Sequence, residues 1–429
     1  MTDAAGAPPA GAAEAPELGE LFRVFGRIGL LSFGGPAAQI ALMHRELVER
    51  RPWLTEERYL SALSFCMLLP GPEAMQLATY CGWRLRGTAG GLLAGLLFVA
   101  PGALVIFALA ALYVSYGQLP VVQALFLGVK ATVVVVVIEA LARVARRALK
   151  APDRWAIAAL AFLAIYALDL PFPLIVAAAG LYGFATRRGG AVAPPPVAAV
   201  AHGGTARTVA LWLAIWLLPL GALRLVDAGR LWEIGAFFAT LAAFSFGGAY
   251  AALAWMAQAA VETQGWLTAE QMIDALGLAE TTPGPLILVT QFVGFLAALP
   301  GGWAAAVLGG LVTLHATFAP CFLWIFAGGP YLDWIASRPR LTGALDAITA
   351  AVVGVILNLS LWFALHVLFA EVGEWRLGPL SPALPDPATL DPRALALTAL
   401  AAALLLWRHM PLPWVLLCCA VAGWGLSLL

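Results

Sequence analysis

Two short helix-breaking motifs occur twice in this chain at the same spacing, and no other feature constrains the fold as strongly. The first copy contains Ser32-Phe33-Gly34-Gly35-Pro36 and Pro70-Gly71-Pro72. The second copy, 213 positions later, contains Ser245-Phe246-Gly247-Gly248-Ala249 and Pro283-Gly284-Pro285. Between the motifs, Trp53-Leu54-Thr55 recurs as Trp266-Leu267-Thr268 at the same offset. Matches without an insertion indicate an internal duplication, and its copied parts are places where helices break.

The composition places these breaks inside a membrane protein. Hydrophobic residues make up 62% of the chain, charged residues 11%, and the mean hydropathy is +0.89. A soluble domain cannot bury that much apolar surface, so we expect an all-α polytopic membrane protein. The net charge is zero and there is no basic tract, so no nucleic-acid partner is indicated. The five cysteines lie in apolar runs without metal-ligand spacing, so we expect no cofactor and no metal site.

The duplication divides the chain into two homologous repeats. We expect a disordered tail at 1–17 rather than a signal peptide, a first repeat at 18–187, a linker with a connecting transmembrane helix at 188–231, and a second repeat at 232–429. Broken apolar runs occupy 18–48, 59–83, 233–261 and 271–298. Unbroken segments occupy 88–116, 119–142, 155–168, 172–186, 208–226, 301–327, 342–369, 393–407 and 412–429. The similarity continues past the breaks at an offset of 219, where Pro101 matches Pro320.

The charges of one loop indicate that the repeats face opposite sides of the membrane. In the first copy, the loop between the two broken runs is basic, with Arg45, Arg50, Arg51 and Arg58. The equivalent loop of the second copy is acidic and has no Lys or Arg. Lys and Arg favour the cytoplasmic side, so the topology is predicted to be inverted, with broken or re-entrant helices at the motifs. This arrangement puts the N-terminus in the cytoplasm and leaves nine full spans. Residues 18–48 are long enough for a re-entrant hairpin or a kinked full span.

Backbone at membrane depth survives outside a helix only where protein buries it or water lines it. Inverted repeats with paired broken helices are typical of secondary transporters, with the site where the breaks meet. The N–H groups freed at each break, together with the helix dipole, suit an anion, and glycine permits close approach. Four half-helix N-termini that converge on one point suit a tetrahedral oxyanion. In a single motif the same residues also fit a plain loop turn; the duplicated pairs favour a functional break.

The predicted binding residues are those of the motifs and two charged neighbours. They are Ser32, Gly34, Gly35, Pro36, Pro70, Gly71, Pro72, Glu73, Lys130, Ser245, Gly247, Gly248, Thr282, Pro283, Gly284 and Pro285. The serine and threonine hydroxyls, including that of Thr281, are expected to act as donors. The prolines are expected in first helical turns, where a missing N–H costs nothing.

Charged residues inside apolar segments are functional candidates because their burial in lipid is costly. Lys130 is placed near the midplane, where it balances a dianion; the alternatives are that it snorkels or pairs with a carboxylate. Glu73 follows the first Pro-Gly-Pro and either caps a helix or couples transport to protons. Glu139 and Glu280 are weaker proton-site candidates, and His315 and His366 are expected to be packing residues.

The motifs Phe-Gly-Gly-Pro, Trp-Leu-Thr-Glu-Glu and Pro-Gly-Pro, duplicated as Phe-Gly-Gly-Ala, Trp-Leu-Thr-Ala-Glu and Pro-Gly-Pro, resemble the chromate ion transporter (CHR) family over nearly the whole chain after residue 18. The resemblance implies a two-domain, long-chain member that exports chromate from the bacterial inner membrane, driven by the membrane potential or a proton gradient. Ala249 and Leu286 depart from the first copy, where Pro36 and Glu73 stand.

The function expected from these features is alternating access, with one repeat rocking against the other around the oxyanion. Transport of sulfate or another oxyanion, and an anion channel, remain as alternatives. An enzyme is not expected, because no segment offers metal-spaced ligands or a nucleophile–base pair. The partners are the oxyanion and the lipid bilayer, and the sequence leaves a homo-oligomer open.

Overall fold

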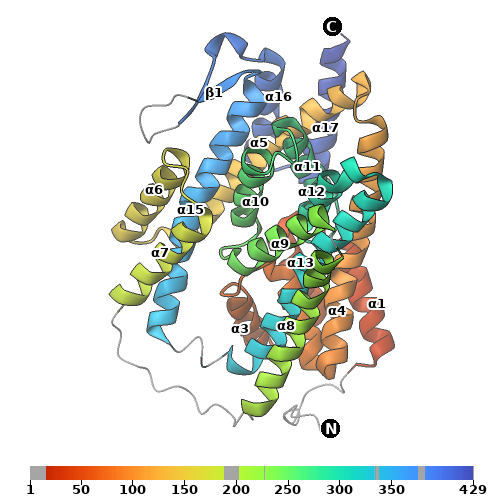
Figure 1. Cartoon of the computed structure of the whole chain (residues 1–429), viewed down its shortest axis with the longest axis vertical. Helices are drawn as coiled ribbons and strands as arrows, with labels where there is room; N and C mark the ends of the chain where they lie inside the picture. The colour runs from red at the N-terminus through yellow and green to blue at the C-terminus, as the bar shows by residue number, and fades with distance from the viewer. Residues whose placement is uncertain are drawn as a thin grey trace. The chain divides into compact units, whose positions relative to one another are not determined.

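The structure is a computed structural model that describes residues 16–187, 202–226, 228–332, 334, 338–374 and 382–428. Most of the predicted tail, residues 1–15, and most of the predicted linker, residues 188–201, lie outside the described residues. The described chain is almost entirely helical, as its composition predicts (Figure 1).

The chain forms two compact units, and both draw on both repeats. The first unit comprises Met1–Ala108, Gly190–Ala249 and Thr282–Arg338. The second comprises Leu109–Gly189, Tyr250–Thr281 and Pro339–Leu429. The two repeats are therefore not two separate bodies.

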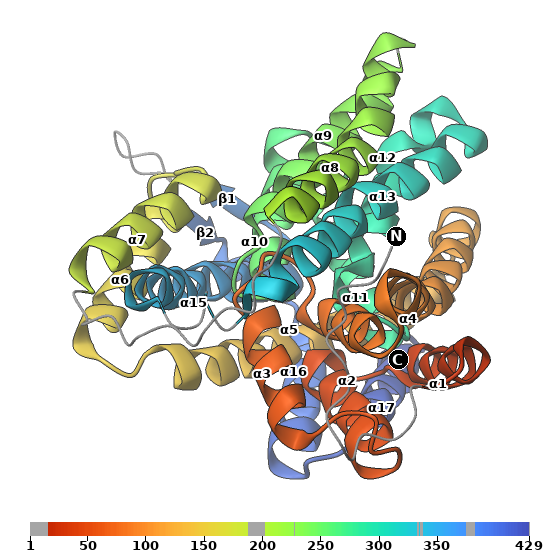
Figure 2. The same cartoon turned by 90° about the horizontal axis from the view of Figure 1, so that it is seen from below.

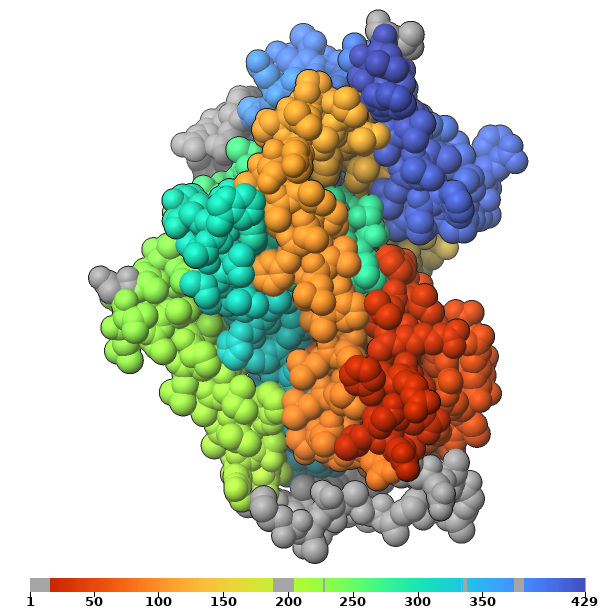
Figure 3. All heavy atoms as spheres, turned by 90° about the vertical axis from the view of Figure 1, so that its right-hand side faces the viewer, coloured from red at the N-terminus to blue at the C-terminus, as the bar shows by residue number. Residues whose placement is uncertain are grey.

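The first unit holds all four duplicated motifs. Its elements are α1 (Leu18–Leu31), α2 (Gly35–His44), η1 (Arg45–Glu49), α3 (Glu56–Cys66), the first part of α4 (Glu73–Tyr116), α8 (His202–Leu225), α9 (Gly229–Phe244), η3 (Leu286–Leu288), α12 (Val289–Ala298), η4 (Leu299–Gly301), α13 (Trp303–Gly328) and η5 (Gly329–Tyr331). Helices α8 and α9 pack on α13, and α12 packs on α13 and α9 (Figure 2). In Figure 3, α1, in red, lies against orange α4, where Gly29 meets the carbonyl of Leu97.

Helix α4 is two helices joined by a sharp reversal. The backbone leaves helical geometry at Arg86 (φ −144°, ψ 33°) and Gly87 (φ 61°, ψ −156°). The two arms then pack so closely that Gly82 and Gly90 have no room for a Cβ. In the second repeat, α12 and α13 are joined at Gly302, which has φ 92° and ψ 175°. The reversal at 86–87 falls where the predicted run at 59–83 gives way to the span at 88–116.

The repeats interlock inside the first unit through reciprocal contacts. A Cβ on Gly91 would lie 2.7 Å from Cε1 of Phe326, and a Cβ on Gly310 would lie 2.7 Å from Cε1 of Phe107. These pairs exchange under the 219-residue offset between the repeats. Each repeat therefore presents a glycine to an aromatic ring of the other.

The second unit gathers the remaining helices. Its elements are the end of α4, α5 (Pro120–Ala148), α6 (Pro152–Tyr166), α7 (Phe172–Thr186), α10 (Ala249–Gln258), η2 (Ala259–Thr263), α11 (Ala269–Thr281), α15 (Pro339–Leu368), β1 (Val372–Glu374), β2 (Ala383–Pro385), η6 (Pro387–Thr389), α16 (Pro392–Ala402), η7 (Ala403–Trp407) and α17 (Leu412–Ser427). The two strands form an antiparallel ribbon between α15 and α16 that the sequence did not predict.

Close helix crossings hold the second unit together. Helix α15 packs on α5, α6 and α7, and α5 also packs on α16 and α17 (Figure 1). Gly128 of α5 lies directly against the carbonyl of Cys419 in α17, so a side chain there would separate the helices. Small residues at crossings are typical of membrane helices, whose association depends on close packing.

Five helices of the described chain are long and apolar enough to cross a membrane: Glu73–Tyr116, Pro120–Ala148, Gly204–Leu225, Trp303–Tyr331 and Pro339–Leu368. Four shorter apolar helices, of 10–17 residues, accompany them. Large apolar side chains are exposed on the outer faces, for example Leu104 and Leu218. This pattern is expected of surfaces that meet lipid.

Candidate functional site

The first motif of each repeat separates two helices. Helix α1 ends at Leu31 and α2 begins at Gly35, while α9 ends at Phe244 and α10 begins at Ala249. The glycines between them have positive φ, +84° at Gly34 and +84° at Gly247. Only glycine adopts such angles without strain, so these residues can reverse the chain where other residues would continue the helix.

The second motif of each repeat also separates helices. Helix α3 ends at Cys66 and α4 begins at Glu73, with Gly71 at φ +114°. Helix α11 ends at Thr281, and after Gly284, at φ +92°, the chain enters η3 and α12. Pro36 lies in the first turn of α2, as predicted, whereas Pro72 directly precedes α4 and Pro285 directly precedes η3.

The structure pairs each first motif with the second motif of the other repeat. The N–H of Gly284 donates to the carbonyl of Ser32 at 2.8 Å, and the N–H of Gly71 donates to the carbonyl of Ser245 at 3.0 Å. We call these pairs the Ser32–Gly284 junction and the Ser245–Gly71 junction. The two junctions exchange under the 213-residue offset. The hydrogen bonds join the four breaks two by two, and the convergence of all four on one point stays a prediction.

The residues that pack against the two junctions are also equivalent positions of the two repeats. Gly284 lies against Gly102, with 3.6 Å between a Cβ on Gly284 and the Cα of Gly102. Gly71 lies against Cys321, the equivalent of Gly102, with 3.3 Å between a Cβ on Gly71 and Sγ. Both junctions are therefore buried against the second arm of a helical hairpin.

The predicted hydroxyl donors are mostly committed elsewhere. Ser32 Oγ donates to the carbonyl of Ile28 at 2.6 Å, and Ser245 Oγ donates to that of Ala242 at 3.1 Å. Thr281 Oγ1 likewise donates within its own helix. These hydroxyls close the ends of the preceding helices, so donation from these breaks rests on backbone N–H groups.

The first turn of α2 carries such groups. No side chain of the described residues caps this turn, which begins at the positive-φ pair Gly34 and Gly35. Uncapped N–H groups at a helix N-terminus attract negative charge. Glu73 is the first residue of α4, so its carboxylate lies at the favourable end of that helix dipole.

Lys130 is the one predicted binding residue outside the first unit. In the second unit its Nζ lies 2.9 Å from Glu270 Oε1 and 3.2 Å from Asp274 Oδ1. Tyr113 also donates to Asp274, at 2.8 Å. Of the readings left open, the structure therefore shows the carboxylate pair, and the lysine charge is already offset.

The other charged or titratable candidates, Glu139, Glu280, His315 and His366, also have hydrogen-bond or ion-pair partners. Arg143 pairs with Glu139 at 3.0 Å, and Tyr250 donates to Glu280 at 3.0 Å. His315 and His366 bond to backbone carbonyls, as expected of packing histidines.

Two buried glutamines at the breaks were missed. Gln39 Nε2 donates to the carbonyl of Gly284 at 2.6 Å, and Gln76 Nε2 donates to that of Pro70 at 2.7 Å. Both are uncharged, so a search for charges in apolar segments passes over them. A usable signal was that Ala252 and Val289 replace them in the second repeat.

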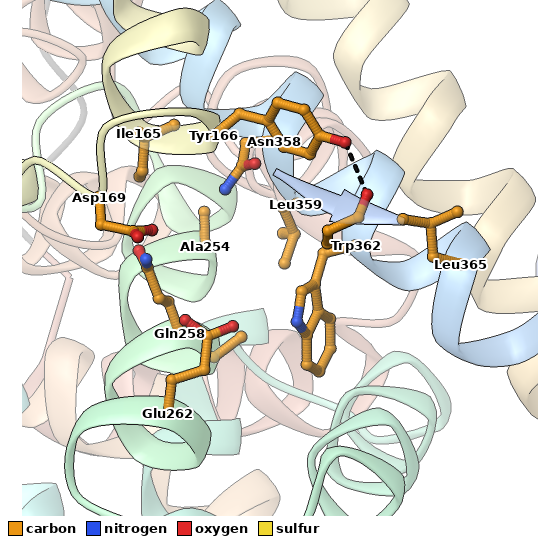
Figure 4. A pocket seen from close by; sticks show the side chains of 12 residues that line it. Ile165, Tyr166, Asp169, Ala254, Gln258, Glu262, Asn358, Leu359, Trp362 and Leu365 are labelled. Atoms are coloured by element: carbon orange, nitrogen blue, oxygen red, sulfur yellow. Dashed lines mark hydrogen bonds between the residues drawn. The ribbon is translucent and has the colours of Figure 1, made fainter. Parts of the chain in front are cut away.

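A small cavity of about 60 Å³ lies within the second unit (Figure 4). Asp169, Gln258 and Glu262 line one side of it, and Tyr166, which donates to the carbonyl of Ala383, lines another. None of its twelve lining residues is a predicted site residue or a cation. Two carboxylates make this cavity unsuited to an anion.

Comparisons with known proteins cover both repeats. The chromate transporter family model matches twice, at residues 19–184 and 232–424. A protein of Synechococcus elongatus named "Probable chromate transport protein" is 31% identical over 88% of this chain and 94% of its own length. Proteins named "Chromate transport protein" from Cupriavidus metallidurans and Pseudomonas aeruginosa are 32% and 35% identical, over 79% of this chain and 80% and 79% of their own lengths. No solved structure matches the chain at comparable significance.

Proposed function

The chain belongs to the chromate transporter family, and from this premise we propose that it is a secondary active transporter that exports chromate across the bacterial inner membrane. It is a multi-pass membrane transport protein rather than an enzyme. The names of its relatives support chromate as the substrate.

The proposed anion site lies at the two junctions. The observation that carries it is the reciprocal pairing of Gly284 with Ser32 and of Gly71 with Ser245. Each pairing gives a hydrogen-bond donor to a backbone carbonyl oxygen that would otherwise repel an anion. The first turn of α2, which no side chain of the described residues caps, still offers backbone N–H donors. An oxyanion bound there needs no formal positive charge from the protein, so Lys130, paired with two carboxylates, is left out of the site.

The inverted arrangement of the repeats is part of the proposal. The contacts Gly91–Phe326 and Gly310–Phe107 are related by the repeat offset, which supports a two-fold relation between the repeats. The charges of the inter-motif loops support opposite orientations of the repeats in the membrane. Because these contacts join the repeats, rocking of one whole repeat against the other would break the first unit. The chain leaves this unit after Ala249 and returns at Thr282, beside two of the breaks. We therefore expect alternating access to move residues 250–281 about those glycines.

A flux assay with purified protein in liposomes tests the function. We expect saturable chromate uptake that accumulates against a chromate gradient when a membrane potential or pH gradient is imposed. Absence of flux above empty liposomes for every tetrahedral oxyanion would overturn the proposal. Uptake that never exceeds equilibrium, with single-channel currents, would indicate an anion channel instead.

Two glycine variants serve as a matched pair in this assay. Gly284→Ala strains a break at φ +92° and brings a Cβ to 3.0 Å from Leu288 Cδ1, so uptake should fall sharply. Gly265→Ala strains a loop glycine at φ +58° that has open space around it, so uptake should persist.

A further inference from the structure

Gln39 and Gln76 hold the broken backbone through their amide nitrogens. Gln39 Nε2 donates to the carbonyls of Gly284 at 2.6 Å and Ser32 at 3.3 Å, so it spans the Ser32–Gly284 junction. Gln76 Nε2 donates to the carbonyl of Pro70, next to the Ser245–Gly71 junction. Carbonyl oxygens can only accept, so each amide must turn its nitrogen to the backbone and its oxygen away.

Each of these amide oxygens is left without a donor. The side chains of Gln39 and Gln76 are 1% and 0% exposed, and neither Oε1 has a hydrogen-bond partner among the described residues. A buried acceptor without a donor is unfavourable, because it has lost its hydrogen bonds to water and gained none in the protein. Two such acceptors at the breaks therefore point to a donor that arrives from outside the protein.

A bare oxyanion cannot supply that donor, because its oxygens only accept. A singly protonated oxyanion carries one hydroxyl group, which donates to an amide oxygen while its other oxygens accept from backbone N–H groups. We propose that Gln39 at the Ser32–Gly284 junction and Gln76 at the Ser245–Gly71 junction each accept a hydrogen bond from the hydroxyl of a singly protonated oxyanion bound at that junction, so that the species carried is hydrogen chromate. This inference rests on the proposed function and narrows its substrate.

The proposal predicts that the protein distinguishes chromate from sulfate by protonation rather than by shape. Sulfate stays fully deprotonated near neutral pH, whereas chromate takes up a proton just below neutrality. The glutamine oxygens therefore favour chromate over sulfate, although the two dianions have the same shape. The second repeat has Ala252 and Val289 at these positions, so the selectivity belongs to the first repeat.

The first test is the pH dependence of chromate binding to the wild-type protein in detergent. Affinity for total chromate should fall about tenfold per pH unit above the pKa of hydrogen chromate, because one proton enters with each anion. Sulfate should compete poorly at every pH. Perrhenate, a tetrahedral monoanion without a hydroxyl group, should also compete poorly.

Perrhenate also reports titration of the protein. Titratable groups lie close to both glutamines. Glu73 precedes Gln76 on α4, Cys321 lies against Gly71, and His44 ends α2. The Tyr59 hydroxyl donates to the carbonyl of Ile40, next to Gln39, and Cys66 and Cys81 lie near Glu73 and Cys321. Their titration would change perrhenate binding as well as chromate binding. The proton carried by chromate changes only the binding of chromate.

Variants separate positioning of the substrate from support of the fold. Gln39→Met should weaken chromate binding roughly three- to tenfold at every pH, the loss of one hydrogen bond to hydrogen chromate, and leave perrhenate binding little changed. Gln76→Met should act in the same direction. Thr313→Val, which removes a buried hydroxyl bonded within its own helix, should keep the wild-type profile.

Four outcomes would overturn the inference. They are chromate affinity that is flat across its protonation range, strong competition by sulfate, perrhenate that competes as well as chromate, and an equal loss of chromate and perrhenate binding in Gln39→Met. Each of them leaves chromate binding in place, so the proposed function would stand. Absence of chromate binding at any pH would instead overturn the proposed function.

Discussion

At the scale of single residues, Gly71 satisfies two requirements together that no other amino acid satisfies: a positive φ and the absence of a Cβ. Its φ is +114°, and a Cβ there would lie 2.9 Å from Nε2 of Gln76 and 3.3 Å from Sγ of Cys321. The backbone conformation disfavours other residues, and the space beside it is already filled. The junction with Ser245 depends on both.

Gly71→Ala should therefore lower the unfolding free energy by more than the roughly 1–3 kcal/mol expected of backbone strain alone. Thermal unfolding in detergent measures this loss. Gly35→Ala is the control, because Gly35 has φ +76° and nothing within 4 Å of a Cβ, so it reports strain without a clash. Equal losses in the two variants would show that packing against Gln76 is unimportant.

Lys130 illustrates how a charge in an apolar helix can be structural. Its ammonium group pairs with Glu270, whose side chain is 67% exposed, and with Asp274, whose side chain is 7% exposed. The buried carboxylate depends on the lysine, while the exposed one has water as an alternative partner.

Lys130→Met should destabilise the protein by roughly 1–3 kcal/mol, because it strands a buried carboxylate, and should leave chromate affinity unchanged. Glu270→Gln, which removes the exposed partner, should cost less than about 1 kcal/mol. Calorimetric unfolding and chromate binding measure the two effects. Lost affinity in a well-folded Lys130→Met protein would return Lys130 to the anion site.

At the scale of elements, His44 joins the hairpin of α2 and α3. Its Nε2 lies 2.6 Å from Oε2 of Glu56, its Nδ1 lies 3.1 Å from Oε1 of Glu49, and its ring meets the edge of Tyr59. The hydrogen bond with Glu56 raises the pKa of His44 above 6.5, and burial opposes the rise. A raised pKa means that the protonated imidazole stabilises the folded hairpin.

The stability from His44 should be fully present below pH 6.5 and disappear as the pH rises through the raised pKa. The effect should be about 0.2–1 kcal/mol, because both carboxylates are exposed. Unfolding measured against pH for the wild type and His44→Gln isolates it: only the wild type should lose this increment. Parallel pH curves would contradict the assignment.

At the scale of the whole molecule, the repeats and the compact units divide the chain differently. Each unit takes segments from both repeats, and α2–α3 belongs to one unit while the equivalent α10–α11 belongs mostly to the other. The two copies of the duplicated sequence are thus divided unequally between the units. This asymmetry agrees with the departures at Ala249 and Leu286 in the second copy.

Single cysteines in the two inter-motif loops test the inverted topology. Glu57→Cys and Thr263→Cys, both exposed, should react with a membrane-impermeant maleimide from opposite sides of the membrane, Glu57→Cys from the cytoplasm. The background should carry Cys418→Ser, because Cys418 is the exposed native cysteine of the described chain. Labelling of both positions from one side would exclude the inverted arrangement.

Several helix ends could be predicted from the amino-acid sequence, because glycine, proline and hydropathy act locally. The segment predicted at 172–186 is α7, and the runs predicted to break do so at Gly34, Gly71, Gly247 and Gly284. The motif pattern also indicated the family, which the comparisons confirm. These features depend on residues close together in the chain.

The pairing of the breaks, the partners of Lys130 and the contacts of Gln39 and Gln76 with the junctions could not be predicted, because they depend on how the chain folds in three dimensions. Gly284 and Ser32 meet across 252 positions, and Lys130 and Glu270 across 140. A hydrogen bond or ion pair depends on distances of a few ångströms, which local periodicity does not encode. Chemistry that is local could therefore be predicted from the sequence, and chemistry that needs two distant segments could not.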